Sequence, residues 1–346
     1  MKIELNSLNL DEMKGLMVDM GEAAYRGEQL FRFFNQQNNL DLDDIKILPK
    51  KLRDKLSDMG YVSKLSILNR LDSRLDETKK YLILLGDRNI IEAVLMKYEH
   101  GYSLCVSTQV GCKMGCKFCA STKGGMIRNL TPAEMLNQVY LIEKDLKIEI
   151  NNIVLMGSGE PLDNYTNTIK FINIMHDQFG HNMSYRNITL STCGIVPKIY
   201  ALADENIPIT LSISLHSPFD EERQKIMPIG KRYKLKDLIE ACSYYFNQTK
   251  RRITFEYTLI SGINDRLEDV NELINLLGGL QAHINLIPLN PIKEYNKGAP
   301  DKRDIDKILL KLRKNKIQAT VRSEKGSDIS GSCGQLRSNY IEGYEN

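Results

Sequence analysis

The sequence lacks several features that would place it in a specialised class of protein. No apolar run reaches the roughly 20 residues that a helix needs to cross a bilayer. The N-terminal residues, Met1–Asn6, lack the apolar core of a secretion signal. The chain also contains no internal repeat and no low-complexity tract. We therefore expect a cytoplasmic, globular protein that has no membrane partner.

A strong excess of charge of either sign is also missing. The chain has 47 Lys and Arg residues against 44 Asp and Glu residues, which gives a net charge of +3 at pH 7. A charge this small does not establish a nucleic-acid partner. Two basic runs occur, at residues 46–55 and 250–252, but such runs more often form a solvated surface than an RNA contact. Charge alone leaves the partner open.

Cysteine is scarce but unevenly placed. The seven cysteines are Cys105, Cys112, Cys116, Cys119, Cys193, Cys242 and Cys333. A reducing cytosol does not maintain static disulfides. Cysteines that cluster in the sequence of such a protein therefore indicate metal or redox chemistry.

The first part of the chain, residues 1–61, has the pattern of a small polar helical unit. Helical spacing of apolar residues extends over residues 12–35. We expect the helix to be interrupted at Gly21 and at Gly27, because glycine disfavours helix interiors.

Two strand-like runs follow, at residues 81–85 and 90–95. The turn-forming segment 86–89 separates them, which predicts a β-hairpin. Glu92 lies inside the second run. An acid at such a position either faces solvent, the ordinary interpretation, or points into a site.

From about Ser103 onward, short β-rich runs alternate with helical segments such as residues 131–144. The strand candidates are residues 104–106, 153–156, 188–191, 209–215, 253–257 and 284–287. This alternation predicts βαβ units and a parallel sheet. Six such runs fit a partial or full α/β barrel, in which functional groups lie at the C-terminal ends of the strands.

A loop directly after the first of these strands carries three cysteines in the order CKMGCKFC, from Cys112 through Cys116 to Cys119. Thiolates at this spacing can ligate a single iron–sulfur cluster. A structural zinc site needs four ligands, and no nearby His or Cys supplies the fourth. Three thiolates on a four-iron cluster leave one iron open to a substrate or cofactor. A zinc knuckle or unrelated buried cysteines form the alternative interpretation.

This Cys-x-x-x-Cys-x-aromatic-Cys spacing resembles the radical S-adenosylmethionine (radical-SAM) superfamily. The segment Gly157–Pro161 resembles the glycine-rich turn of that superfamily. Further segments resemble, in order, the RlmN family and its relative Cfr: Cys105–Cys112, Phe118–Ser121, Gly159–Pro161, Ser214–Pro218 and Cys333–Leu336. The chain is thereby identified as a member of the RlmN/Cfr group over nearly its whole length.

The resemblance implies the cofactors and the residues that bind them. A [4Fe-4S] cluster would be ligated by Cys112, Cys116 and Cys119, with S-adenosylmethionine (SAM) on the open iron. The residues that match the SAM contacts of the family are Gly159, Glu160, Ser191, Ser214, Leu215, His216 and Asn290. An electron donor such as flavodoxin or ferredoxin would then drive cleavage of SAM to a deoxyadenosyl radical.

The resemblance implies catalytic roles for three further residues. Cys333 would take a methyl group from SAM, and the carbon radical made from that S-methyl group would join the enzyme to adenine. Cys105 would resolve the adduct through a transient disulfide with Cys333. Glu92 matches the position of a proton acceptor in the family.

The implied reaction is methylation of adenine C2 in 23S rRNA, at the peptidyl transferase centre, and in tRNA next to the anticodon. One alternative is Cfr-type methylation at adenine C8, and another is a non-catalytic protein that binds zinc or RNA. The segments Val110–Cys112 and Phe118–Thr122 resemble RlmN more than Cfr, whose members tend to have Cys-Gly-Cys before the loop.

The expected fold class is α/β, the chain divides into three regions, and we expect the protein to be a monomer. Residues 1–61 would form a helical, RNA-binding accessory domain, and residues 62–97 a β-hairpin connecting region. Residues 98–346 would form the radical-SAM partial (β/α) barrel with its C-terminal catalytic cysteine. Residues 1–61 carry nine Lys or Arg against eleven Asp or Glu, so their RNA-binding role rests on the resemblance. The basic run 46–55 is the candidate for phosphate contact.

Overall fold

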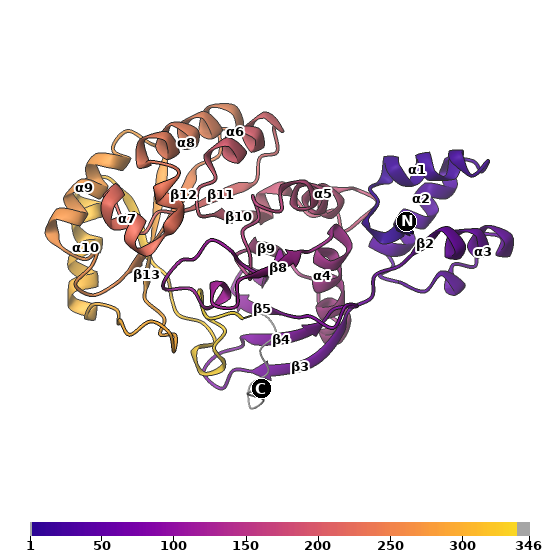
Figure 1. Cartoon of the computed structure of the whole chain (residues 1–346), viewed down its shortest axis with the longest axis horizontal. Helices are drawn as coiled ribbons and strands as arrows, with labels where there is room; N and C mark the ends of the chain where they lie inside the picture. Colours follow the sequence, from indigo (N-terminus) through magenta and orange to yellow (C-terminus); the bar gives the residue numbers. More distant parts are fainter. Residues whose placement is uncertain (1, 338–346) are drawn as a thin grey trace.

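The computed structural model describes residues 2–337. A small N-terminal helical unit lies at one end of the molecule, beside a larger α/β body (Figure 1). The unit contains α1 (Leu10–Asp19), α2 (Tyr25–Asn35) and α3 (Lys50–Met59). Two short strands, β1 (Ile3–Glu4) and β2 (Gly60–Tyr61), pair in parallel and bring the two ends of this unit together.

Gly27 does not interrupt a helix, and this part of the sequence expectation is wrong. The chain turns at Gly21, whose φ of +78° favours glycine, whereas Gly27 lies inside α2. A Cβ atom at position 27 would lie only 2.6 Å from the backbone nitrogen of Lys14 in α1. Glycine is therefore needed at this position because the backbones of α1 and α2 approach each other closely, a contact that helical spacing does not reveal.

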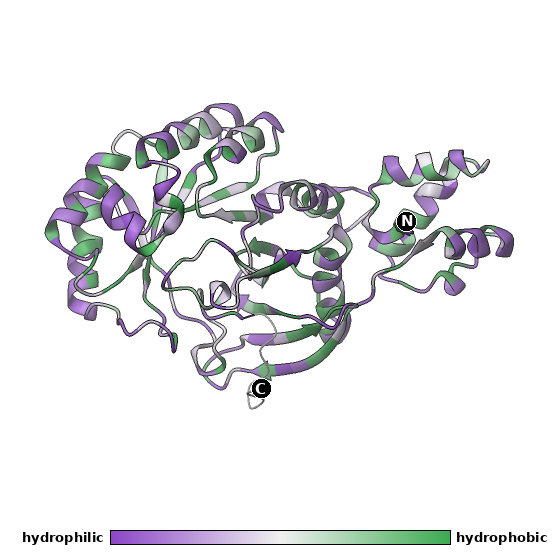
Figure 2. Cartoon of the chain, viewed as in Figure 1, coloured by the Kyte–Doolittle hydropathy of each residue, from purple (hydrophilic) through white to green (hydrophobic). Residues whose placement is uncertain are grey.

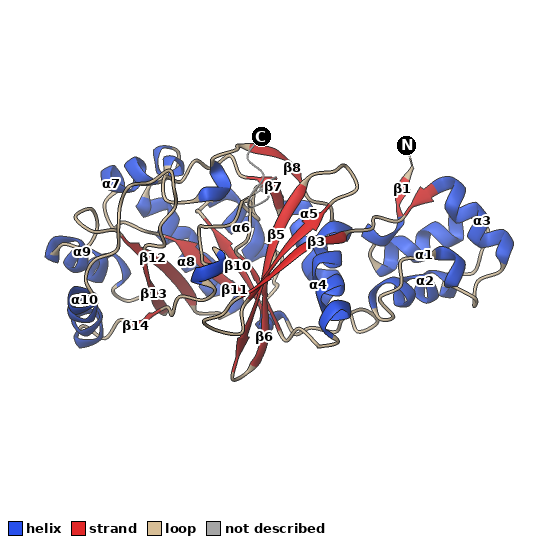
Figure 3. Ribbon diagram, turned by 90° about the horizontal axis from the view of Figure 1, so that it is seen from below, coloured by secondary structure: helices blue, strands red, loops and turns tan. Residues whose placement is uncertain are grey.

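The larger body is built on a ten-stranded sheet within residues 2–337, in the order β14-β13-β12-β11-β10-β9-β6-β5-β4-β3. Neighbouring strands from β6 to β14 run parallel: β6 (Gly101–Cys105), β9 (Asn152–Leu155), β10 (Ile188–Thr192), β11 (Thr210–Ser214), β12 (Ile253–Leu259), β13 (Ala282–Pro288) and β14 (Gln318–Val321). The helices that connect them are α4 (Pro132–Leu146), α5 (Tyr165–His176), α6 (Val196–Asp204), α7 (Asp220–Ile226), α8 (Leu235–Thr249), α9 (Leu267–Leu277) and α10 (Lys302–Lys314). These helices flank the curved sheet, which confirms the predicted partial (β/α) barrel (Figures 1 and 3).

Six of the parallel strands coincide with the six predicted runs, and β14 is the one that the sequence pattern missed. It has four residues, of which Ala319 alone is buried. A strand this short shows neither an apolar run nor a regular alternation. Its position matters because Arg322, which follows it directly, lies in the functional site.

The predicted hairpin forms between β4 (Lys79–Leu84) and β5 (Ile90–Tyr98), which pair antiparallel. Together with β3 (Ser66–Asp72) these strands continue the barrel sheet, because β5 also pairs with β6. The segment between the helical unit and the barrel is therefore part of the main sheet. Glu92 lies opposite Leu82 in this register.

Apolar residues concentrate on the strands and on the helix faces turned toward them (Figure 2). The buried core runs through the sheet and includes Leu190, Leu211, Phe255 and Ile284, which are fully enclosed. Because the carboxyl ends of parallel strands meet at one edge, the residues that follow β9, β10, β11 and β13 are brought together there. Within residues 2–337, no helix is both long and apolar enough to cross a membrane.

Candidate active site

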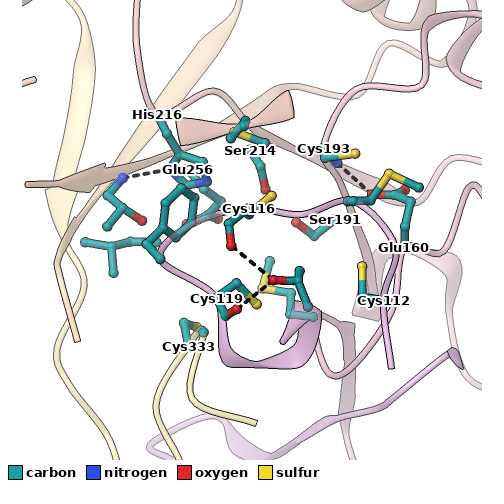
Figure 4. A pocket seen from close by; sticks show the side chains of 18 of the residues that line it. Cys112, Cys116, Cys119, Glu160, Ser191, Cys193, Ser214, His216, Glu256 and Cys333 are labelled. Carbon is teal, nitrogen blue, oxygen red and sulfur yellow. Dashed lines mark hydrogen bonds between the residues drawn. The ribbon is translucent and has the colours of Figure 1, made fainter. Parts of the chain in front are cut away.

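A cavity with about 910 Å³ of empty space, including its mouth, opens at the carboxyl ends of the parallel strands. Its wall includes ten of the predicted site residues: Cys112, Cys116, Cys119, Gly159, Glu160, Ser191, Ser214, His216, Asn290 and Cys333. Figure 4 shows the three cysteines of the loop facing the strand-end residues across this space. Residues spread over more than 220 positions of the sequence therefore line a single pocket.

Backbone contacts and the side chain of Thr122 hold the loop that carries the three cysteines. It begins after β7 (Gln109–Gly111), which pairs with β8 (Met126–Asn129). Gly111 has a φ of +75°, and a Cβ atom at this position would collide with the carbonyl oxygen of Gly125. The Thr122 hydroxyl lies 3.2 Å from the carbonyl oxygen of Cys116 and 3.0 Å from that of Cys119, and donates to them (Figure 4).

The chemistry of the donor set fits an iron–sulfur cluster. Within residues 2–337, no three His, Cys, Asp or Glu side chains gather closely enough to hold a single metal ion. A four-iron cluster does not require such a gathering, because each thiolate ligates a different iron. Burial raises the pKa of Cys112 to about 12 and also raises the pKa values of Cys116 and Cys119. Since the ligands bind as thiolates, loading of the cluster must displace their protons.

The glycine-rich turn after β9 places Gly159 and Glu160 on the wall. Gly159 has a φ of +111°, and a Cβ atom there would lie 2.7 Å from the side chain of Gln109. The Glu160 carboxylate accepts hydrogen bonds from the backbone N–H groups of Cys193, at 2.8 Å, and of Leu162, at 3.0 Å. Burial raises the pKa of Glu160, and these two hydrogen bonds oppose that shift. The carboxylate thus joins the ends of β9 and β10.

The His216 ring is a neutral group on the cavity wall. Its Nδ1 accepts a hydrogen bond from the backbone N–H of Thr258 at 2.9 Å. Burial, together with the charge of Arg223, lowers the pKa of His216 to about 3. The ring packs edge-to-face on Phe118 of the cysteine loop, with centroids 4.8 Å apart. His216 therefore connects the loop to the sheet through packing, and not through charge.

Leu215 differs from the other predicted SAM contacts. Its side chain is fully enclosed in the apolar core and does not line the cavity. Its backbone N–H donates to the carbonyl oxygen of Glu256 at 3.0 Å. A contact through the side chain of Leu215 does not follow from this geometry.

The C-terminal segment brings Cys333 to the cysteine loop. The Ala120 N–H donates to the carbonyl oxygen of Gly334 at 2.7 Å, and the Ser121 hydroxyl donates to that of Leu336 at 2.6 Å. The Asn290 side-chain amide donates to the carbonyl oxygen of Cys333 at 2.9 Å. Cys333 consequently lines the main cavity next to the cysteine loop (Figure 4).

A second cavity, also with about 910 Å³ of empty space, adjoins the first and is lined by both Cys333 and Cys105. Cys105 ends β6, and burial raises the pKa of its thiol to about 12. Arg322 and Cys333 lie on the walls of both cavities. The pKa of Arg322 is raised above its ordinary value, mainly by Cys333. The structure thus brings the two remote cysteines to a common space beside one cation.

Glu92 lies beside this arrangement but lines neither cavity. Its side chain is 2% exposed and forms an ion pair with Lys80 at 3.3 Å. It also accepts a hydrogen bond from the backbone N–H of Arg337 at 2.8 Å. Burial raises the pKa of Glu92, while Lys80 and Arg337 oppose the shift. Glu92 therefore anchors the segment that carries Cys333.

Sequence reasoning missed four charged residues at or near the site: Lys80, Arg223, Glu256 and Arg322. Glu256 and Arg322 line the main cavity, Arg223 is buried behind the strand ends, and Lys80 is buried beside Glu92. Of these four residues, only Glu256 could have been found from the sequence, because it is, like Glu92, an acid inside an apolar strand, here β12. The others lie in segments whose patterns are typical of exposed surface.

Two family models match the chain. The model described as "Radical SAM superfamily" matches residues 106–277, and the model described as "Ribosomal RNA large subunit methyltransferase N-terminal domain" matches residues 3–62. These matches cover the helical unit and the part of the barrel from β7 to α9.

Full-length relatives and a solved structure agree with the family models. The chain is 49% identical over 338 residues to the "Probable dual-specificity RNA methyltransferase RlmN" of Finegoldia magna, covering 98% of this chain and 97% of that protein. It is 50% identical over 339 residues to the protein of the same name in Clostridioides difficile, covering 98% of each chain. The crystal structure of a radical SAM methyltransferase from Sphaerobacter thermophilus is similar, with a TM-score of 0.91 and 41% identity over 96% of this chain and 99% of that one.

If the three loop cysteines ligate the cluster, Ala in place of Cys112, Cys116 or Cys119 should lower bound iron by more than about fivefold after anaerobic reconstitution, because each thiolate would be one of three protein ligands. Cleavage of SAM to deoxyadenosine should be lost as well. Iron analysis and chromatography of the SAM products measure both effects. Cys242→Ala is the matched control, since this buried thiol lies in α8 and does not line the cavity. Full iron content with intact SAM cleavage in a loop variant would remove that residue from the ligand set.

Proposed function

The chain belongs to the RlmN family of radical-SAM RNA methyltransferases, and on this basis we propose that it forms 2-methyladenosine in RNA. As a member of this family it uses a [4Fe-4S] cluster and SAM. Its proposed substrates are 23S rRNA, at the peptidyl transferase centre, and tRNA, next to the anticodon, in agreement with the dual specificity in the names of its relatives. Family membership does not favour the Cfr-type reaction at C8, and it excludes a non-catalytic zinc protein.

The observation that carries this proposal is the position of Cys333. This thiol lines the cavity that holds the three loop cysteines, and it also lines the second cavity, which holds Cys105. A methyl group carried on the Cys333 sulfur can thus be reached from the SAM side and presented to a base on the other side. Neither the loop cysteines nor Cys105 borders both spaces.

Adenine C2 is an electron-poor carbon without a lone pair, so it cannot displace the methyl group of SAM directly. Cys333 solves this problem by attacking the methyl group itself, which gives S-methylcysteine and S-adenosylhomocysteine. When bound, the reduced cluster and a second SAM supply the radical that removes one hydrogen atom from this S-methyl group. The Cys333-bound methylene radical then adds to C2 and joins the enzyme covalently to the RNA. The adduct regains its aromatic ring when the C2 proton is lost and one electron leaves, which the oxidised cluster, when bound, would take back.

Cys105 releases the product by thiol–disulfide chemistry. Its thiolate attacks the Cys333 sulfur, the bond between that sulfur and the methylene carbon breaks, and the electron pair remains on carbon, which takes up a proton. Cys105 and Cys333 end as a disulfide, and the two electrons that they lose form the new C–H bond of the methyl group. Because burial raises the pKa of Cys105 to about 12, the thiolate must be stabilised when it forms, and Arg322 is the cation beside it.

Glu92 is the proposed proton acceptor, and it contacts the C-terminal segment that carries Cys333. Its raised pKa suits a group that takes up a proton. The hydrogen bond from the Arg337 N–H and the ion pair with Lys80 hold the carboxylate at a fixed place in this segment. Transfer of a proton from the adenine to Glu92 requires the C-terminal segment to move or a water molecule to intervene, because Glu92 lines neither cavity.

We propose that six strand-end residues contact SAM, because all of them line the main cavity: Gly159, Glu160, Ser191, Ser214, His216 and Asn290. Leu215 is proposed to act through its backbone.

The helical unit, residues 1–61, is the proposed RNA-binding domain. Residues 62–97 complete the sheet, and residues 98–346 carry the chemistry. The basic run of the helical unit exposes four lysines that are available to phosphates: Lys46, Lys50, Lys51 and Lys55. We propose a cytoplasmic monomer that receives electrons from flavodoxin or ferredoxin.

The two remote thiols should fail in different ways when each is replaced. Cys333→Ala should contain no S-methylcysteine and make no methylated RNA, because the methyl carrier is missing. Cys105→Ala should still be methylated at Cys333 and should accumulate a protein–RNA adduct, because formation of the adduct is intact and its release is not. Peptide mass spectrometry and denaturing gels separate these states, with Cys242→Ala as the unaffected control. Identical behaviour of the two variants, with neither adduct nor S-methylcysteine, would contradict the assigned roles.

The product nucleoside decides between adenine C2 and C8. The two carbons lie at opposite ends of the purine, so each requires its own orientation of the flat base against the same Cys333 methylene. We expect nucleoside mass spectrometry of RNA treated with the reconstituted enzyme to detect 2-methyladenosine at a level at least tenfold above 8-methyladenosine. A product consisting of 8-methyladenosine would move the chain to the Cfr reaction.

A further inference from the structure

Arg223, in α7, is the largest side chain that is fully enclosed within residues 2–337, with 0% exposure. Its guanidinium donates three hydrogen bonds to backbone carbonyl oxygens. Nε donates to Leu215 at 3.1 Å, and Nη2 donates to Cys193 at 2.7 Å and to Ser214 at 3.2 Å. These carbonyl groups lie where β10 and β11 end, directly behind the wall of the main cavity. The arginine therefore fixes two of the strand ends that define the site.

The charge of Arg223 is not matched by a carboxylate. In the described part of the chain, no Asp or Glu oxygen lies within 4.0 Å of its guanidinium nitrogens. The nearest acid on the same helix, Asp220, instead accepts a hydrogen bond from the backbone N–H of Leu235 at 2.9 Å. Nη1 is buried and has no hydrogen-bond partner. Burial of an unpaired charge is costly, so a compensating negative charge is expected close by.

The titratable groups that act most strongly on Arg223 are the thiols of Cys193 and Cys116, followed by the Asp220 carboxyl group and the Cys242 thiol. Burial lowers the pKa of Arg223, and Cys193 and Cys116 oppose that shift most strongly.

The helix of Arg223 packs on the cysteine loop: the Lys117 N–H donates to the carbonyl oxygen of Ile226 at 3.0 Å, and Ile226 and Met227 pack together with Cys193 against Cys116 and Phe118. Two glycines also lie close to Arg223. A Cβ atom at Gly194 would lie 3.5 Å from Nη2, and one at Gly230 would lie 3.5 Å from Nη1.

A four-iron cluster supplies the missing negative charge. Three thiolates outweigh the positive charge of the oxidised iron–sulfur core, so the ligated cluster is anionic, and reduction adds one more negative charge. A fixed positive charge in a site shielded from water favours the more negative, reduced state. Net charge and solvent exposure around a cluster are among the factors that set its reduction potential.

We propose that Arg223 is the buried counter-charge of the iron–sulfur cluster, and that it raises the reduction potential of the cluster while it fixes the ends of β10 and β11. Arg223 is a positioning residue in this scheme, because it touches neither SAM nor RNA. The inference depends on ligation by the loop cysteines, and it is independent of which RNA atom is methylated.

The test compares Arg223→Gln with Arg223→Lys and with Lys225→Gln. Glutamine keeps a hydrogen-bond donor but removes the charge, whereas lysine keeps the charge without the planar fork. Lys225 lies on the same helix with its side chain 62% exposed, so its charge is screened by water and serves as the control. Each reconstituted protein is analysed for iron and then titrated electrochemically without SAM, with the reduced cluster followed by electron paramagnetic resonance.

Arg223→Gln should make the cluster at least tenfold harder to reduce, a shift of about 59 mV to lower potential for a one-electron couple. Arg223→Lys and Lys225→Gln should shift the potential by less than half of that amount. A wild-type potential in Arg223→Gln with a full iron content would overturn the proposal and leave Arg223 as a structural hydrogen-bond donor. If Arg223→Gln binds too little cluster to titrate, Arg223→Lys decides between the outcomes. A fully loaded cluster with the wild-type potential in Arg223→Lys supports the role of the positive charge. Loss of the cluster from Arg223→Lys contradicts that role.

These outcomes remain distinct from those that test the proposed function. An enzyme that methylates a different RNA atom would still show the shift in potential, because the counter-charge acts on the cluster alone. Loss of iron from the variants of the loop cysteines is measured separately and does not involve Arg223.

Discussion

Two hydrogen bonds hold the C-terminal segment against the cysteine loop, from the Ala120 N–H to the Gly334 carbonyl oxygen and from the Ser121 hydroxyl to the Leu336 carbonyl oxygen. They join residues more than 200 positions apart and leave Cys333 facing the same cavity as the proposed cluster ligands. The barrel provides the opposite wall, because its parallel strands end at a common edge. Together with the hydrogen bonds from Asn290 to the Cys333 carbonyl oxygen and from the Arg337 N–H to Glu92, this contact fixes the thiol that we propose as the methyl carrier relative to the cysteine loop. The catalytic arrangement therefore depends on a local fit between two loops that the sheet itself does not specify.

Buried charges then define the boundaries of the site. Lys80 and Glu92 form an ion pair with 4% and 2% of their side chains exposed, and the Arg337 N–H connects this pair to the Cys333 segment. Arg322 lies on the wall between the two cavities, and Arg223 lies behind the strand ends. Charges that are shielded from water interact strongly with ionised thiols and clusters. The same groups that hold the strand ends and the C-terminal segment in place thus also govern where negative charge can form.

The sequence predicts the repeated units of the fold and the chemistry of its main loop, but not the contacts between distant segments. The strands β6 and β9 to β13 are apolar runs between helices, and the spacing of Cys112, Cys116 and Cys119 is distinctive, so both were predictable. The strand β14 is too short and too exposed to show a pattern, so Arg322 after it was not found. Arg223 belongs to the segment DEERQKI, which has the composition of a solvent-facing helix, and only tertiary packing buries it. The close approach of α1 and α2 at Gly27 escaped prediction for the same reason.

The most direct test of the account uses SAM whose methyl group carries three deuterium atoms. If Cys333 first takes this methyl group and one deuterium is then abstracted from it, the methyl group of the RNA product must hold two deuterium atoms and one hydrogen. The abstracted deuterium must appear in deoxyadenosine. Mass spectrometry of the product nucleoside and of deoxyadenosine over several turnovers measures both. A product methyl group that keeps all three deuterium atoms would contradict the account, because it would have moved from SAM to RNA intact.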